Sequence, residues 1–170
     1  MKQFADIWTS DWKPDYTKFK YTGWDLVNKI KPGEQILDIG CGYNLFKPHF
    51  GDDLYGIDPY VKSADELVSW QDYVPHKNFD VFFILGSINF FDESYVDNQI
   101  AKLSQVAQSG ARAYWRQNPG TGPHSLNATD VPFYPWTFEL NEYFADKYNF
   151  TIKEMKLDTG DRIYAEWIKN

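Results

Sequence analysis

The sequence predicts an α/β fold in which a mostly parallel sheet is completed by an antiparallel hairpin. Short apolar runs alternate with segments of helical periodicity, as expected for strands that are joined by helical crossovers. A turn with two glycines follows the first apolar run directly. The C-terminal part reads as two alternating strands, 151–157 and 162–168, around Asp158-Thr159-Gly160-Asp161. These observations predict one domain over residues 1–170, with five β–α steps and a closing hairpin.

The N-terminal part is expected to contain an extension, one helix and the first strand. Residues 1–20 are polar and aromatic, and Pro14 breaks any early helix. Residues 21–30 place apolar side chains at helical spacing, and Lys31-Pro32-Gly33 ends that helix. The apolar run at 36–39 is typical of a parallel strand that is buried on both faces.

Three further strands are expected in the first half of the chain. Residues 54–57 form a second apolar run, and a helix is expected around 45–50, between the first two strands. The crossover that follows has few residues, and 66–70 is the best candidate for the third strand. Residues 79–85 are β-branched and aromatic, which indicates a central buried strand.

The same alternation continues in the second half. Residues 94–107 carry an apolar stripe with a period of 3.6 residues, and Gly110 stands where a helix C-cap is expected. A strand is expected at 111–116. Residues 137–148 again have the pattern of an amphipathic helix, which precedes the closing hairpin.

The turn after the first strand has the residues of a ligand-binding loop. Asp38 interrupts the apolar run, where a buried charge is costly without a partner. Gly40 and Gly42 allow positive φ and a close backbone approach, and Asn44, which also tolerates positive φ, extends the turn. Asp58 ends the second strand twenty residues after Asp38. Adjacent strand ends face the crevice where nucleotides bind, and a carboxylate there can accept both ribose hydroxyls, so we expect a nucleoside-containing cofactor.

The glycine pattern excludes two common nucleotide motifs. A dinucleotide fingerprint requires G-x-G-x-x-G, but Leu45 occupies the position of the third glycine. The sequence G-x-x-x-x-G-K-[ST] of a phosphate-binding P-loop does not occur. The pattern that fits is D-x-G-x-G-x-N, followed by an acidic strand end; the alternative is a glycine turn in another kind of α/β protein.

This pattern resembles the class I (Rossmann-like) S-adenosylmethionine-dependent methyltransferase family, whose turn usually reads [D/E]-x-G-x-G-x-G. The present chain departs from it at Asn44, which replaces the last glycine. The resemblance extends over about 21–170, because family members insert an antiparallel seventh strand beside the fifth. It implies a three-layer sandwich with a seven-stranded, mostly parallel sheet and S-adenosylmethionine as the cofactor.

The resemblance also implies where the cofactor lies. Family members hold its methionine end at the glycine turn and its ribose hydroxyls at the acidic strand end, which is Asp58 here. The residues that correspond to the methionine end are Asp38, Gly40, Cys41 and Gly42.

Two more segments inherit cofactor contacts from the resemblance. An acidic side chain after the third strand usually meets the adenine amino group. Asp72 stands there, with Gln71 as the neighbour that could replace it. The alternative for Asp72 is an exposed loop carboxylate. Leu85, Gly86 and Ser87 leave the fourth strand and are expected to pass beneath the sulfonium.

The acceptor side is expected near the Gly- and Pro-rich segment 118–135. Its length without obvious structure suggests a substrate lid, and His124 within it is the best candidate for a general base. A plain surface histidine is the alternative. Arg116, Tyr134 and Trp136 border the segment and are candidates for an acceptor pocket, although Trp136 is equally compatible with a core position.

Composition limits the partners. The net charge is −7 and the Lys and Arg residues are scattered, which argues against nucleic acid. The single cysteine, Cys41, excludes an internal disulfide and a multi-cysteine metal site and fits a reducing compartment. We expect no signal peptide, and the longest apolar run, 81–85, is too short to span a bilayer. A cytoplasmic protein is therefore expected.

Three functions remain compatible with the sequence. The first is methyl transfer from S-adenosylmethionine to a small molecule or a protein side chain. The second is a non-catalytic cofactor-binding or partner protein on the same fold, which the short second crossover and Asn44 suggest. The third is an aminopropyltransferase, for which Asp92-Glu93 would have to supply a carboxylate-rich amine site.

Overall fold

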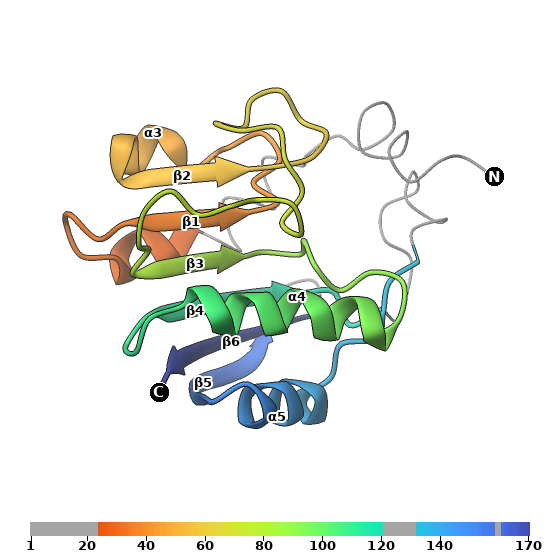
Figure 1. Ribbon diagram of the computed structural model, residues 1–170. Coiled ribbons are helices and arrows are strands. Elements are labelled where there is room, and N and C mark those ends of the chain that lie inside the picture. The colour runs from red at the N-terminus through yellow and green to blue at the C-terminus, as the bar shows by residue number, and fades with distance from the viewer. Residues whose placement is uncertain (1–23, 121–131, 159–160) are drawn as a thin grey trace.

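A computed structural model of the protein describes residues 24–120, 132–158 and 161–170. The described chain forms one sheet of six strands in the order β2-β1-β3-β4-β6-β5 (Figure 1). The first four strands of this order are parallel, whereas β6 runs antiparallel to both of its neighbours. The strands are β1 (Ile36–Ile39), β2 (Leu54–Ile57), β3 (Val81–Ile84), β4 (Arg112–Gln117), β5 (Phe150–Asp158) and β6 (Arg162–Lys169).

The antiparallel strand predicted from the C-terminal hairpin is confirmed. β6 follows β5 directly in the chain but lies between β4 and β5 in the sheet, so it pairs with both. Its register pairs Arg112 with Ile168 and Gln117 with Ile163. As a result, the first residues of β6 lie at the same edge of the sheet as the last residues of β4.

Helices cover both faces of the sheet (Figure 1). The helix α4 (Glu93–Val106) begins at Asp92, whose carboxylate accepts the Tyr95 N–H, and α5 (Phe138–Lys147) begins at Thr137, whose hydroxyl accepts the Leu140 N–H. These two helices pack on the same face of the sheet. The 3₁₀ helix η2 (Trp24–Lys29), the short helix α3 (Lys47–Phe50) and the 3₁₀ turn η3 (Gly51–Asp53) complete the described elements.

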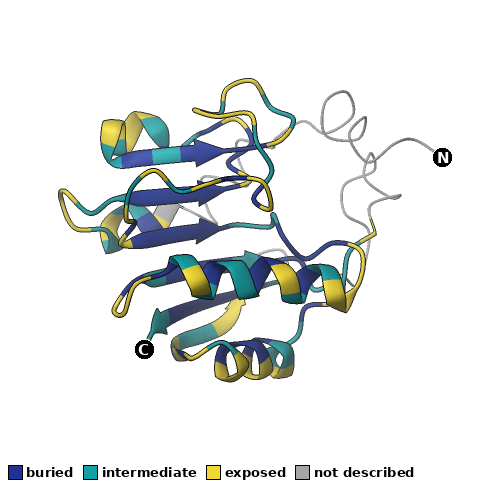
Figure 2. Cartoon of the chain, viewed as in Figure 1, coloured by how far each residue is buried: buried dark blue, intermediate teal, exposed yellow. Residues whose placement is uncertain are grey.

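The core has one cluster on each face of the sheet. The larger cluster lies beneath α4 and α5 and contains the fully buried rings of Trp115, Trp136 and Trp167. The smaller cluster joins Leu26 of η2 and Phe46 to the opposite side chains of the strands. The central strands are buried along their whole length (Figure 2), as the apolar runs predicted.

The predicted strand at 66–70 is wrong, and for this reason the described sheet has six strands and not seven. Only Glu66 pairs with β2, through an isolated parallel bridge to Ile57. The Asp65 carboxylate accepts the Gly56 N–H at 2.8 Å, so a side chain occupies part of the edge that a strand would use. Trp70 then turns into the core. Burial of one large indole therefore overrides the extended pattern of this segment.

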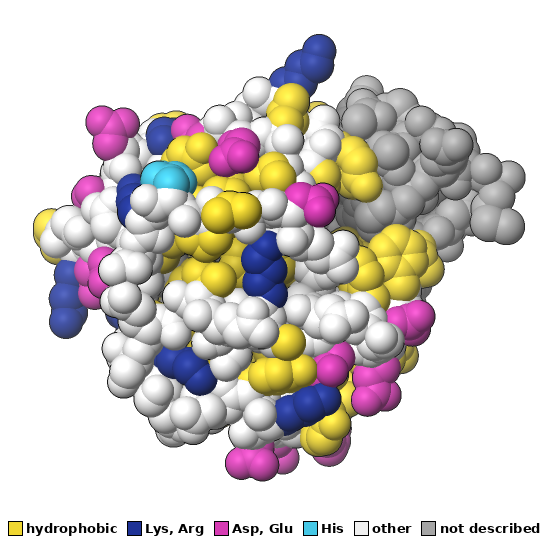
Figure 3. All heavy atoms as spheres, viewed as in Figure 1, with side chains coloured by type: hydrophobic (Ala, Val, Ile, Leu, Met, Phe, Trp, Pro, Cys, Tyr) yellow, Lys and Arg dark blue, Asp and Glu magenta, His cyan; other side chains and the backbone are white. Residues whose placement is uncertain are grey.

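The remaining elements lie within a few residues of the expected bounds. The helix expected at 21–30 is a 3₁₀ helix over its described part, Trp24–Lys29. The N-terminal extension and most of the segment 118–135, including His124, lie outside the described residues. None of the described helices combines the length and apolar character needed to cross a bilayer. On the face shown in Figure 3, Lys and Arg side chains are separated from one another and mixed with Asp and Glu.

Candidate functional site

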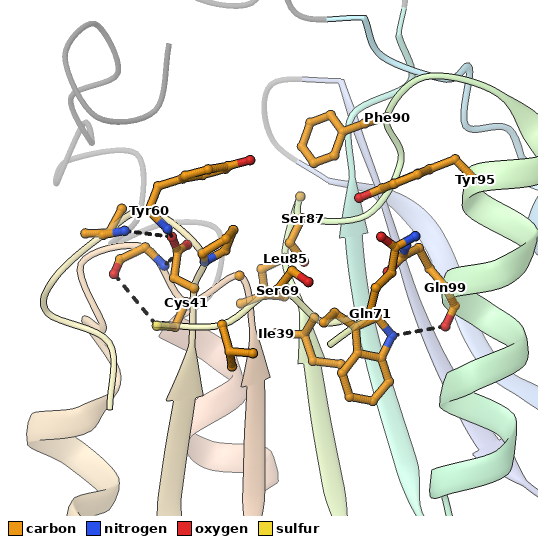
Figure 4. Close-up of a pocket in the computed structure, with 18 of the residues that line it drawn as sticks. Ile39, Cys41, Tyr60, Ser69, Gln71, Leu85, Ser87, Phe90, Tyr95 and Gln99 are labelled. Carbon is orange, nitrogen blue, oxygen red and sulfur yellow. Dashed lines mark hydrogen bonds between the residues drawn. The ribbon is translucent and has the colours of Figure 1, made fainter. Parts of the chain in front are cut away.

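A cavity of about 410 Å³ opens at the edge where the parallel strands end. Its walls come from the loops that follow β1, β2 and β3, from the segment 68–71 and from one side of α4 (Figure 4). Eight of the residues expected to bind a cofactor line it: Gly40, Cys41, Gly42, Asp58, Gln71, Leu85, Gly86 and Ser87. The topology thus brings together residues that are up to 47 positions apart in the sequence, from Gly40 to Ser87.

The glycine turn is fixed to the end of β2 and packed against the end of β3. The N–H groups of Gly40 and Cys41 both donate to the Ile57 carbonyl, at 2.9 and 3.0 Å. Gly40 has φ +71°, and a Cβ placed on it would lie 2.3 Å from the Ser87 Cβ. Only glycine satisfies both the conformation and the contact at this position.

Asn44 replaces the expected third glycine and has the conformation that a glycine would have. Its φ is 55°, in the left-handed region that Asn tolerates. Its side-chain amide donates to the Ser63 carbonyl and to the Asp65 carboxylate, both at 3.2 Å. The side chain lies over Gly56, where a Cβ would approach the Asn44 Oδ1 to 2.7 Å. The role of Gly56 could not be inferred from the sequence, because the strand pattern does not show which side chain covers it.

Asp58 is held by three backbone N–H groups. Its Oδ2 accepts from Gly42 at 3.1 Å, and its Oδ1 accepts from Tyr60 at 2.8 Å and from Val61 at 2.9 Å. The carboxylate therefore joins the glycine turn to the loop after β2 while it lines the cavity. Oδ2 has one of these three partners and can accept a further hydrogen bond from a ligand.

Burial and neighbouring carboxyl groups shift the protonation of two residues at the glycine turn. Asp38 is buried beneath the turn and does not line the cavity. Its burial, and secondly the charge of Asp58, raise the pKa of Asp38 to about 8. Burial and the neighbouring carboxylates also raise the pKa of the Cys41 thiol, which keeps it protonated. A positive ligand group nearby would favour the ionised form of Asp38 and so lower its pKa.

Asp72 does not reach the cavity, in contrast to the position implied by the resemblance. Its carboxylate accepts the Ser69 hydroxyl at 2.6 Å in a local turn, and the residue is exposed. This is the exposed loop carboxylate that the sequence also allowed. Gln71 does line the cavity. Gln99 of α4 lines it as well and was missed, although a polar residue within the apolar stripe of a helix was visible as a signal.

The residues expected to contact an acceptor are dispersed. Trp136 has no exposed surface and stacks between Trp115 at 5.7 Å and Phe144 at 5.9 Å, so it is a core residue and does not belong to a pocket. Arg116 donates to Asp158 at 2.8 Å and does not line the cavity. The hydroxyl of Tyr134 lies 3.4 Å from Glu93 of α4, outside the cavity lining.

Aromatic side chains that the sequence analysis missed stand at the cavity instead. Figure 4 shows Tyr60 on one side of the opening, with Phe90 and Tyr95 across from it. Phe91 stacks edge-on against Tyr95 at 4.9 Å and is 43% exposed. Its φ of 63° is unusual for a bulky residue, and its N–H donates to the Pro132 carbonyl at 2.6 Å.

The carboxylates proposed for an amine site are already used elsewhere. Asp92 caps α4, and Glu93 pairs with the Tyr134 hydroxyl. Neither residue lines the cavity. This placement gives no support to the aminopropyltransferase alternative.

No protein-family model matches the chain, and no curated protein matches its sequence. Solved structures match it over most of its length. Magnesium protoporphyrin IX methyltransferase from Synechocystis, with bound SAM, has a TM-score of 0.69 and 15% identity, covering 97% of this chain and 90% of that chain. The N-methyltransferase NodS from Bradyrhizobium japonicum, in complex with S-adenosyl-L-homocysteine, has a TM-score of 0.69 and 12% identity, with coverages of 96% and 94%.

A third match is an S-adenosylmethionine-dependent methyltransferase from Mesorhizobium loti. It has a TM-score of 0.66 and 12% identity, and the match covers 86% of this chain and 97% of that chain. The fold is therefore that of the Rossmann-like methyltransferases, as the glycine turn and the closing hairpin predicted.

The residues of the cavity fit S-adenosylmethionine as a cofactor. The backbone at Gly40 forms a turn that a Cβ would obstruct, and the Asp58 carboxylate, which lines the cavity, can accept a hydrogen bond from a polar ligand. Two buried polar atoms at the cavity, Ser87 Oγ and Gln99 Nε2, have no partner among the described residues. A polar ligand would supply those partners.

Proposed function

We propose that this protein is an S-adenosylmethionine-dependent methyltransferase that acts on a small molecule. The observation that carries the proposal is one hydrogen bond and its setting: the Gly42 N–H donates to Asp58 within a cavity that the exit of β3 also lines. The glycine turn, the acidic strand end and the small residues after β3 therefore share one site on a methyltransferase fold.

The roles of the residues follow from their positions. The backbone of Gly40, Cys41 and Gly42 would hold the methionine end of the cofactor. The Asp58 carboxylate, which is held in place by three backbone N–H groups, would accept hydrogen bonds from the ribose hydroxyls. Gly86 and Ser87 would allow a close approach beneath the sulfonium because they are small.

Bound S-adenosylmethionine supplies a methyl group that is already activated by a sulfonium. The protein would then orient an acceptor and exclude water, and such alignment can contribute about 7–11 kcal/mol to lowering a barrier. A general base is needed only for an acceptor that starts protonated. His124 remains the candidate for that base, and His124→Ala should then lower turnover much more than cofactor affinity.

A small, largely apolar acceptor is favoured over a protein side chain or nucleic acid. Tyr60, Phe90, Phe91 and Tyr95 surround the opening, and aromatic faces of this kind suit a flat or apolar molecule. One structure of the same fold, an O-methyltransferase from Planctomyces limnophilus, was solved in complex with apigenin. On the face shown in Figure 3, the basic residues are scattered and form no continuous surface for a phosphate backbone.

The proposal is tested by calorimetric titration with S-adenosylhomocysteine, followed by a turnover screen of small-molecule acceptors. Asp58→Asn should weaken binding by about 1.5–3 kcal/mol, the usual size for a hydrogen bond to a charged group. Asp80→Asn is the matched control, because Asp80 also accepts a backbone N–H, from Gln35, but precedes β3 at the opposite edge of the sheet. Absence of binding to the wild-type protein, or equal loss in both variants, would contradict the proposal. Binding without turnover of any acceptor would favour the non-catalytic alternative.

A further inference from the structure

Gln99 is an unusual residue for its position on α4. The buried face of this helix consists of Val96, Gln99, Ile100 and Leu103, so Gln99 is its one polar member. It is 2% exposed, and its amide nitrogen has no hydrogen-bond partner among the described residues. Burial of an unpaired amide destabilises a fold, so packing alone does not explain why an amide stands here.

The side chain lies in the wall of the cavity, at a corner that is held rigidly. The Trp70 indole N–H donates to the Gln99 carbonyl at 3.1 Å. Lys102, one turn further along α4, donates to the carbonyls of Gln71 at 2.8 Å and Tyr73 at 2.7 Å. These bonds fix the loop that lines the cavity to the main chain of α4 at Gln99, so the point from which the Gln99 side chain extends is set before any ligand binds.

This corner lies across the cavity from the glycine turn. Figure 4 shows Cys41 and Tyr60 on one side and Gln99 on the other, with Leu85 and Ser69 between them. If the turn and Asp58 hold the rest of a nucleoside ligand, its base still needs a polar partner. The unpaired Gln99 amide is a buried polar group on the opposite wall that can supply one.

We propose that Gln99 recognises the adenine base of the cofactor through its side-chain amide. The inference rests on the proposed function and names the residue that selects the base. A primary amide presents a donor beside an acceptor, which matches the exocyclic amino group and an adjacent ring nitrogen of adenine. Asp72, which the resemblance implied for this role, does not line the cavity, and its carboxylate accepts the Ser69 hydroxyl.

The test compares two ligands that differ only in the amino group. These are S-adenosylhomocysteine and its analogue with unsubstituted purine in place of adenine, each titrated by calorimetry. Wild-type protein should prefer the adenine ligand by about 5- to 140-fold, the range for a two-bond amide–adenine pair. The purine analogue leaves the amide oxygen unpaired, and rotation of the amide cannot replace the missing donor.

Two variants assign the preference to one side chain. Gln99→Met keeps the length of the side chain but removes both polar atoms, so it should bind the two ligands with similar affinity. Asn141→Leu is the control, because Asn141 of α5 is also a buried amide with an unpaired oxygen but does not line the cavity. It should retain the wild-type ratio.

The outcomes separate the inference from the proposed function. If wild-type protein binds neither ligand, the proposed function fails and the inference fails with it. If wild-type protein binds both ligands equally well, only the inference is overturned, and this comparison needs no variant to fold. Retention of the preference by folded Gln99→Met would also overturn it.

Discussion

The contact between Gly40 and Ser87 predicts a large and specific effect of one added methyl group. Gly40→Ala places a Cβ 2.3 Å from the Ser87 Cβ, on a backbone with φ +71°. Two separate penalties therefore act on the variant. A left-handed conformation costs a residue with a side chain about 1–2 kcal/mol, and an overpacked contact costs about 1–3 kcal/mol. The free energy of unfolding should fall by about 2–5 kcal/mol, from a total that is about 5–15 kcal/mol in most domains.

The two penalties are separated by matched variants. Gly33→Ala and Gly110→Ala carry the same conformational penalty, since both glycines have φ +85°, but a Cβ at either meets no atom within 4 Å. Urea unfolding of these controls should show a loss of only about 1–2 kcal/mol. In the Gly40→Ala background, Ser87→Gly removes the Cβ and Oγ of Ser87, which are the two atoms closest to the new methyl group. The next atom, the Cα of residue 87, lies 3.5 Å away. The double variant should regain about 1–3 kcal/mol.

Cofactor binding gives a second measurement on the same variants. Gly40→Ala should also weaken S-adenosylhomocysteine, because the turn must shift away from Ser87 to admit the methyl group. The reasoning is refuted if Gly40→Ala is no less stable than Gly110→Ala. It is equally refuted if Ser87→Gly brings no recovery, because the contact would then not be the cause.

Two further predictions concern a buried carboxylate and a buried ring. Burial raises the pKa of Asp38 to about 8 in the folded protein, whereas the unfolded value is about 3.9. The folded state thus keeps a proton that the unfolded state has lost in this window, and stability falls as the pH rises from about 4 to about 8. Asp38→Asn should remove this part of the slope and be more stable near the upper limit, which urea unfolding across the window measures; an unchanged slope would contradict the argument. Trp136→Ala should lose about 3–5 kcal/mol of stability, as for other buried rings, with cofactor affinity unchanged at temperatures where it is folded. If Trp136→Ala were as stable as the wild-type protein, Trp136 would not be a core residue, and its predicted role in an acceptor pocket would be favoured again.

Local sequence determined the parts of the fold that were predicted well. The unit from β1 to Asp58 needs only an apolar run, a turn that permits positive φ and a second apolar run, all within neighbouring residues. The closing hairpin was likewise visible from its alternation. Its insertion between β4 and β5 was expected only through the family resemblance, since pairing order is not a local property.

Long-range packing decided the parts that were not predicted. The segment 66–70 has the pattern of a strand, but Trp70 is buried in the core beneath α4. Its indole N–H donates a hydrogen bond to the Gln99 carbonyl. Trp136 borders a Gly- and Pro-rich segment, yet its stacking on Trp115 places it in the core. The sequence could not show that these aromatic residues, which are far apart in the chain, pack against each other.

The place of β6 in the sheet also sets the order in which the protein can be assembled during synthesis. The ribosome delivers β4, then β5, and only afterwards Arg162–Lys169, the strand that joins the two. Until then β5 has no partner in the sheet, and the edge of β4 is unpaired. Such edges invite association with other chains, and pairings between distant segments form slowly. The nascent chain therefore passes through a period in which Trp115 lacks its contact with Trp167 of β6. Chaperones that bind exposed apolar surface would act at that point.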